Sequence, residues 1–154
     1  MSYGKFLEQF KLGAVINHPV KKTISESDNN FFCLMTLNHH PVHLDIEYAK
    51  SNHHEKILVV GTLVFSLSVG MTVGDISGKA IANLNYENIN HHGPVFIGDT
   101  IRTETEILGI RDSKSNKNAG IIYVESRAFN QDNKLVLSFR RNVLVKKENW
   151  GIDG

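Results

Sequence analysis

Residues 38–45 (NHHPVHLD) place three histidines, an asparagine and an aspartate within one short segment. An imidazole titrates near neutral pH, so it is the natural side chain for moving a proton, and a neighbouring amide can orient it or hold a water molecule. His43 and Asn38 are therefore candidates for general acid–base chemistry. A solvated polar loop is the alternative interpretation of the same composition.

The histidine spacing does not favour a metal site, because zinc takes three or four ligands in a tetrahedral arrangement. His39 and His43 have the i, i+4 spacing of one helical face, but Pro41 lies between them and interrupts a helix. The single cysteine, Cys33, excludes an internal disulfide and a thiolate zinc site, and its apolar neighbours predict a core position. We expect no metal and no redox cofactor, and we expect the histidines outside residues 38–45 to lie on the surface.

Gly61 stands at the predicted start of an apolar helix. A helix N-terminus presents unpaired N–H groups and a positive dipole, and a glycine lets a substrate oxygen approach closely. Such donors would stabilise a developing enolate or oxyanion. Close packing of the helix against a sheet is an equally good reason for the glycine.

Local patterns predict the elements around the histidine-rich segment. Residues 13–22 form an extended segment, and Ser25 with Asp28 gives the S-x-x-D pattern of a helix N-terminus. Pro41 cannot continue that helix, so a loop follows it, and Asp45 begins a second short helix. The apolar residues of the first helix share a wide face: Phe31, Phe32, Leu34 and Met35.

Residues 57–74 form an uncharged stretch of 18 residues, which is long enough for a membrane span. Seven of the 18 are Gly, Thr or Ser, and only Lys56 provides a basic flank, so we favour the buried helix of a globular domain. Four segments with the alternation of strands follow it: 80–86, 100–108, 119–129 and 135–145. This order predicts one α+β domain over residues 1–154, with an antiparallel sheet curled around the helix.

The overall charge limits the choice of partners. Seventeen Lys and Arg against 16 Asp and Glu give a net charge of +1, which argues against binding nucleic acid through bulk charge. The scattered basic residues include Arg111 and Lys114, which could contact the phosphates of a nucleotide-bearing substrate. No apolar leader is visible at the N-terminus, and we expect a cytoplasmic location with no membrane partner.

Two motifs resemble those of the MaoC-like enoyl-CoA hydratases and dehydratases. Residues 36–45 (TLNHHPVHLD) are similar to T-G-D-x-N-P-x-H-x-D, and residues 94–100 (PVFIGDT) match P-V-F-x-G-D-T. From Arg111 onward the chain looks like the subgroup that acts in mesaconyl-CoA and methylmalyl-CoA dehydration. The resemblance covers residues 24–146.

The resemblance implies a hot-dog fold, in which a long helix is wrapped by a curved antiparallel sheet, and a homodimer or higher homo-oligomer with the acyl-CoA site between subunits. It assigns general acid–base catalysis to His43, and Asn38 stands where the family has an aspartate. In the family's H-G pair the glycine is kept as Gly61, whereas Val60 replaces the histidine. Ser66 falls where the family has a helix serine near the site.

The implied reaction adds or removes water across the 2,3 double bond of a short enoyl-CoA, whose acyl group can be branched or dicarboxylic. The Gly61 N–H would polarise the thioester carbonyl, with Val60 and Ser66 beside it, and Asn38 would position water. An amide cannot take a proton, so Asn38 would lower or abolish activity unless another group substitutes. No cofactor is needed, because coenzyme A is part of the substrate. A hot-dog thioesterase and a non-catalytic acyl-CoA-binding module are the alternatives.

Overall fold

The computed structural model describes residues 3–51 and 53–151. Three α-helices occur in these residues, α1 (Glu26–Met35), α2 (Ile46–Lys50) and α3 (Gly61–Thr72). The strands are β1 (Val15–Thr23), β2 (Ala80–His91), β3 (Thr100–Asp112), β4 (Ala119–Phe129) and β5 (Leu135–Lys146). Short helical turns complete the chain: η1 (Leu7–Gln9), η2 (Pro41–His43) and the π-turn η3 (Val73–Ser77).

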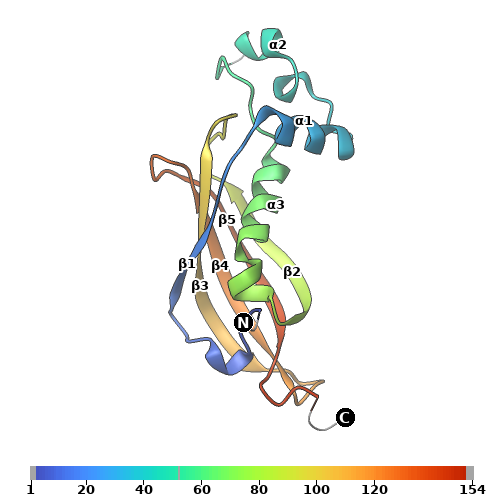
Figure 1. Cartoon of the computed structure of the whole chain (residues 1–154), viewed down its shortest axis with the longest axis vertical. Coiled ribbons are helices and arrows are strands. Elements are labelled where there is room, and N and C mark those ends of the chain that lie inside the picture. The colour runs from blue at the N-terminus through green and yellow to red at the C-terminus, as the bar shows by residue number, and fades with distance from the viewer. Residues whose placement is uncertain (1–2, 52, 152–154) are drawn as a thin grey trace.

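The five strands form one antiparallel sheet in the order β1-β3-β4-β5-β2. The sheet curves around α3, and α1 and α2 lie beyond the end of α3 that begins at Gly61 (Figure 1). Strand β5 alternates buried and partly exposed residues, so one face of the sheet packs on the helix and the other faces outward. This confirms the predicted α+β class and its hot-dog arrangement.

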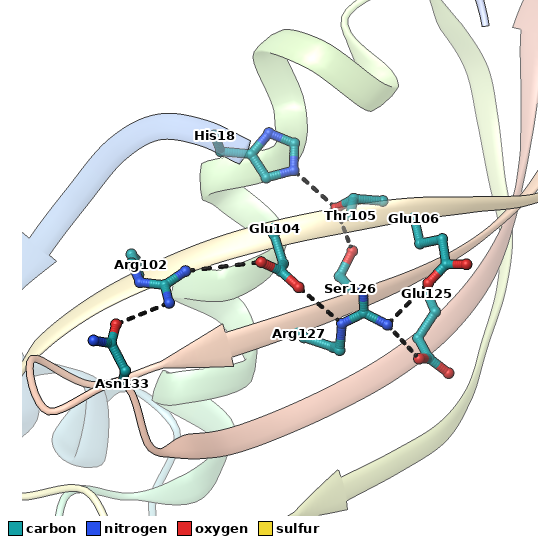
Figure 2. A network of polar contacts seen from close by, with 9 residues as sticks. All are labelled: His18, Arg102, Glu104, Thr105, Glu106, Glu125, Ser126, Arg127 and Asn133. Atoms are coloured by element: carbon teal, nitrogen blue, oxygen red, sulfur yellow. Dashed lines mark hydrogen bonds and ion pairs between the residues drawn. The ribbon is translucent and has the colours of Figure 1, made fainter. Parts of the chain in front are cut away.

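The outward face of the sheet carries an ionic network. Arg127 donates to Glu104 and Glu106 at 3.0 Å each and to Glu125 at 3.2 Å (Figure 2). Arg140 adds a 2.6 Å contact to Glu125. These charges explain why α3 packs on the opposite face.

The inward face has two apolar clusters separated by buried polar residues. One cluster runs along α3 and includes Leu63, Val95 and Phe139. The other lies at the far end of the sheet and includes Ile107, Val124 and Val143. Five buried residues between them form what we call the polar layer: His18, Thr72, Thr105, Ser126 and Arg141.

The surface prediction for the remaining histidines is wrong for His18, which is 4% exposed. Its Nδ1 lies 2.8 Å from Asp75 Oδ2. Figure 2 shows the contact on the other ring nitrogen, Nε2, which lies 2.8 Å from Thr105 Oγ1. The Thr105 hydroxyl lies 2.8 Å from the Ser126 hydroxyl. The ring can be buried because both of its nitrogens have hydrogen-bond partners. The sequence around His18 does not reveal those partners.

Helix α1 begins as predicted but turns a different face inward. The Ser25 side chain accepts from the Asp28 N–H, and the Asp28 carboxylate accepts from the Ser25 N–H, which completes a capping box. The buried side chains of the helix are Asn29 and Cys33. Three members of the predicted apolar face are exposed instead: Phe31 (68%), Leu34 (59%) and Met35 (61%). Because α1 lies beyond the end of the sheet, only its Asn29–Cys33 side has a neighbour to pack against.

Helix α3 is shorter than the uncharged stretch from which it was predicted. Residues 57–60 are extended, with Leu58 bridged to Phe96, and the helix proper ends at Thr72 before the π-turn. One face remains exposed along Thr62, Ser66 and Gly70, so the helix is not buried on every side. Within residues 3–51 and 53–151, no helix is long and apolar enough to cross a membrane.

Candidate active site

The histidine-rich segment forms a tight turn between α1 and α2. Pro41 opens the η2 turn, where its missing N–H costs nothing. The Asp45 side chain then accepts from the N–H groups of Glu47 and Tyr48 and caps α2. His43 is therefore held at the end of a turn fixed on both sides.

The ring of His43 is oriented by the chain that enters α3. Its Nδ1 lies 2.6 Å from the carbonyl oxygen of Leu58. A carbonyl oxygen only accepts, so Nδ1 carries the hydrogen and the Nε2 of the neutral ring holds the free lone pair. No other described residue forms a hydrogen bond with that Nε2. The half-buried ring therefore presents a basic nitrogen that can exchange protons with a ligand.

Asn38 lies at the opposite end of the same loop. Its N–H donates to the Cys33 carbonyl at 3.0 Å, and its Oδ1 faces the His40 N–H at 3.4 Å. The preceding residue, Leu37, has a φ of +62° in the left-handed region that favours glycine. The backbone turn that ends α1 therefore sets the position of the Asn38 amide.

The N-terminus of α3 follows Leu58, whose carbonyl oxygen holds the His43 ring, by three residues. The N–H of Val60 is not free, because it donates to Asn29 Oδ1 at 3.1 Å, and the Val60 side chain is buried in the core. The Val60 N–H is therefore engaged within the chain, and the predicted role of Val60 beside Gly61 stays a prediction. The N–H groups of Gly61 and Thr62 have no acceptor in the described chain and remain available.

A cavity of about 350 Å³ opens beside Gly61. Its wall includes His54, His91 and His92 from two separate segments, together with Leu58. The His91 ring lies so close to Gly61 that a Cβ there would be 2.9 Å from its Cε1. Close packing against His91 is therefore one reason for the glycine.

The family model for the MaoC like domain matches residues 8–128. The chain belongs to this family. Both motifs that carried the resemblance lie inside the matched region, which confirms it.

Curated relatives of this MaoC-like domain include the mesaconyl-CoA hydratase of Cereibacter sphaeroides and the beta-methylmalyl-CoA dehydratase of Chloroflexus aurantiacus. Each is 35% identical over 144 residues, or 94% of this chain, covering 42% of the first relative and 41% of the second. The chain thus spans less than half the length of these two relatives. The (R)-specific enoyl-CoA hydratase of Aeromonas caviae is 28% identical over 107 residues, covering 70% of this chain and 75% of that relative.

Solved structures show the same fold. A putative MaoC domain protein dehydratase from Chloroflexus aurantiacus superposes with a TM-score of 0.91 at 34% identity, over 96% of this chain and 42% of that chain. A Mycobacterium tuberculosis protein described as a double hotdog fold gives a TM-score of 0.87 at 21% identity, over 96% of this chain and 46% of that one.

In this MaoC-like domain, Ser66 does not line the cavity beside Gly61. It is exposed on α3 and lines a separate groove of about 400 Å³ between α3, α1 and β1. The groove is mainly apolar, with Leu63 and Phe32 in its wall and Lys21 and Lys22 at β1. Lys22 is already paired with Asp28 at 2.8 Å.

Arg111 and Lys114 are exposed at the far end of the sheet. Strand β3 runs from Thr100, near the Leu58–Phe96 bridge, to Asp112. At about 3.3 Å per residue, Arg111 lies roughly 35 Å along that strand from Thr100. The structure therefore does not bring either residue near His43 within one protomer.

Sequence reasoning missed two residues of this region, Asn29 and His91. The only available signal for Asn29 was its i, i+4 spacing from the apolar Cys33, which places both on one face of α1. His91 is distant in sequence from Gly61, and no local pattern connects them. Among the described residues, no group of three or more His, Cys, Asp or Glu side chains could hold a metal ion.

Proposed function

We propose that this MaoC-like domain is a hydro-lyase that adds or removes water across the 2,3 double bond of an enoyl-CoA thioester. The observation that carries the proposal is the orientation of His43. Its Nδ1–H is bound to the carbonyl of Leu58, three residues before Gly61, which leaves Nε2 without a hydrogen-bond partner among the described residues. A base held by the chain that leads into free helix N–H donors suits proton transfer coupled to enolate stabilisation.

In the hydration direction, Nε2 of His43 takes a proton from water as the water oxygen bonds to C3. The electron pair of the double bond moves toward the thioester carbonyl and gives an enolate, which the Gly61 N–H stabilises. The imidazolium then returns its proton to C2, so water is added with no net change in the enzyme. Dehydration follows the same steps in reverse.

Asn38 contributes to this scheme by orienting water rather than by accepting a proton. Its position is fixed by the backbone bond to Cys33, and its amide offers both a donor and an acceptor. His43 is therefore the single proton carrier of the proposed site.

The acyl group is proposed to be short, and branched or dicarboxylic. Support comes from the relatives named mesaconyl-CoA hydratase and beta-methylmalyl-CoA dehydratase, which are 35% identical over 94% of this chain. Coenzyme A enters as part of the substrate, and no cofactor takes part in the proposed steps.

Two copies of the domain are proposed to associate as a homodimer or higher homo-oligomer. Strand β2 is an edge strand, and its exposed apolar side chains include Leu84 (49%) and Ile89 (43%). An exposed apolar edge strand favours pairing with another chain. The chain also covers only 46% of the Mycobacterium tuberculosis structure described as a double hotdog fold. Light scattering should give at least twice the 17.3 kDa mass of one chain.

The function is tested with a panel of enoyl-CoA thioesters, including crotonyl-CoA and mesaconyl-CoA. Loss of the enoyl absorbance is followed in parallel with release of free thiol. We expect absorbance loss without thiol release, and a drop in kcat of about 10²–10⁴-fold for His43→Ala. The matched control is His39→Ala in the same loop, which should keep its kcat. Undiminished turnover by His43→Ala, or thiol release as the main reaction, would refute the proposal.

Asn38→Asp tests the assignment of Asn38. Because His43 is proposed to carry the proton alone, we expect kcat to change by less than about tenfold, below the contribution of a general base. A gain well beyond tenfold on simple enoyl-CoA substrates would instead show that a second base is missing in the natural sequence.

A further inference from the structure

Asn29 is a fully buried amide on α1, with 0% of its surface exposed. Its Nδ2 donates to the carbonyl oxygen of His43 at 2.8 Å. Its Oδ1 accepts from the N–H of Val60 at 3.1 Å. One side chain therefore joins the turn that carries His43 to the first residue before α3.

These two hydrogen bonds hold both parts of the candidate site, the turn that carries His43 and the N-terminus of α3. His43 is held by its backbone through Asn29 and by its ring through the Leu58 carbonyl. Val60 is the N-cap of α3, and Gly61 follows it directly. The Asn29 amide thus fixes the position of Nε2 of His43 relative to the free Gly61 N–H.

The chemistry of the position requires a carboxamide. The His43 carbonyl needs a donor and the Val60 N–H needs an acceptor, and a carboxamide supplies both from one planar group. An ionised carboxylate supplies only the acceptor, and an aliphatic side chain supplies neither. A group left unpaired at this depth would cost about 1–3 kcal/mol.

We propose that Asn29 is a positioning residue for the reaction, acting through His43 and the α3 N-terminus rather than by touching substrate. The inference rests on the proposed function, because it concerns the geometry of that site. A shift of about 1 Å between reacting groups can cost on the order of 10²-fold in rate. Loss of the Asn29 bridge should therefore lower kcat more than it raises KM.

The test is Asn29→Asp, with Asn30→Asp as the matched control on the next residue of the same helix. We expect Asn29→Asp to lower kcat by about 10–100-fold with KM within threefold, and Asn30→Asp to match the natural protein. A protonated aspartic acid can donate to the His43 carbonyl, so the kcat of Asn29→Asp, relative to that of the natural protein at the same pH, should recover as pH falls.

A second readout does not depend on turnover. The His43 ring signals in a proton NMR spectrum, assigned with His43→Gln, should move in Asn29→Asp and stay in place in Asn30→Asp. If the natural protein hydrates none of the thioesters, the proposed function fails, and the NMR comparison still tests the bridge.

Foldedness is checked by near-ultraviolet circular dichroism. Should Asn29→Asp not fold, Asn29→Ser serves instead, because it is too short to span both partners and introduces no charge. Kinetics within threefold of the natural protein together with unmoved His43 signals would overturn the inference. An equal loss of kcat in Asn30→Asp would overturn it as well.

Discussion

At the scale of single residues, His18 is a buried titratable group with a partner on each ring nitrogen. Asp75 accepts from Nδ1–H, and the Thr105 hydroxyl donates to Nε2 when the ring is neutral. Burial lowers the pKa of His18 below 6.5, against the raising effect of Asp75 and with a smaller lowering effect from Arg141 and Lys5. The folded protein therefore prefers the neutral ring.

This pKa shift predicts a loss of stability in mild acid. As pH falls below 6.5, the unfolded chain binds a proton at His18 that the folded chain resists, so the free energy of unfolding falls until the lowered folded pKa is reached. One such group changes stability by at most about 1.4 kcal/mol per pH unit. Urea unfolding between pH 8 and pH 5 measures the effect. His18→Asn should remove this part of the pH dependence, and an identical decline in both proteins would contradict the prediction.

Leu37 has a backbone conformation that is strained for a residue with a side chain. It is 79% exposed and has a φ of +62°, a conformation that costs an L-residue about 1–2 kcal/mol. Leu37→Gly should therefore raise the free energy of unfolding by about 0.5–1 kcal/mol, after the entropy cost of glycine in the unfolded chain. Leu34→Gly, on the exposed face of α1, should lower it by about 1 kcal/mol. Chemical denaturation distinguishes the two signs, and a loss in both variants would show that Leu37 is unstrained.

At the scale of elements, the last residue of β2 restricts which side chain fits at the first residue of α3. The His91 ring would lie 2.9 Å from a Cβ on Gly61, although His91 is exposed and its ring can move. The two residues therefore compete for space at the mouth of the cavity beside Gly61.

A double-mutant cycle on Gly61→Ala and His91→Ala measures this competition. In the His91→Ala background, Gly61→Ala should raise the free energy of unfolding by about 0.4–1 kcal/mol, because alanine restricts the unfolded chain. In the natural background the displaced ring should cancel that gain, which gives a coupling energy of about 0.5–1 kcal/mol. Strictly additive effects would mean that the ring does not press on Gly61 in solution.

At the scale of the whole molecule, the polar layer divides the core into two apolar clusters. The strand register explains the layer, because Thr105 pairs with Ser126 and Val124 pairs with Arg141 across neighbouring strands. Arg141 is 1% exposed, donates to Thr72 Oγ1 at 2.7 Å, and leaves its Nε without a partner. Burial lowers the pKa of Arg141, and no carboxylate in the described chain forms an ion pair with it.

Because Arg141 is a buried cation with no carboxylate partner among the described residues, Arg141→Met should leave the free energy of unfolding unchanged or raise it. Replacing buried charges by apolar side chains of similar volume is often neutral or stabilising by about 1–4 kcal/mol. Thr72 would keep its bond to the Val69 carbonyl. The control is Arg140→Met on the outward face, which removes the Glu125 pair and should change the free energy of unfolding only slightly, because an exposed ion pair contributes little to stability. Thermal and urea unfolding measure the stability of both variants. A clear destabilisation by Arg141→Met would contradict the prediction.

The sequence by itself determined what depends on near neighbours in the chain. The capping box at Ser25, the stop at Pro41 and the cap at Asp45 are local, and all three lie where the patterns predicted them. The alternation of apolar and polar residues also predicted strands. The strand predicted over residues 119–129 has the same bounds as β4. His43 and Asn38 were identified from the motif that places them in one turn.

Only the tertiary structure decided which distant groups meet. The amide of Asn29 takes the Val60 N–H, the His91 ring reaches Gly61, and His18 finds Asp75, each across more than 25 residues of chain. The exposed face of α1 was unpredictable for the same reason, because an apolar helix face is buried only if another element covers it. Local patterns fix backbone direction and side-chain period, whereas partners depend on how strands and helices pack around one another.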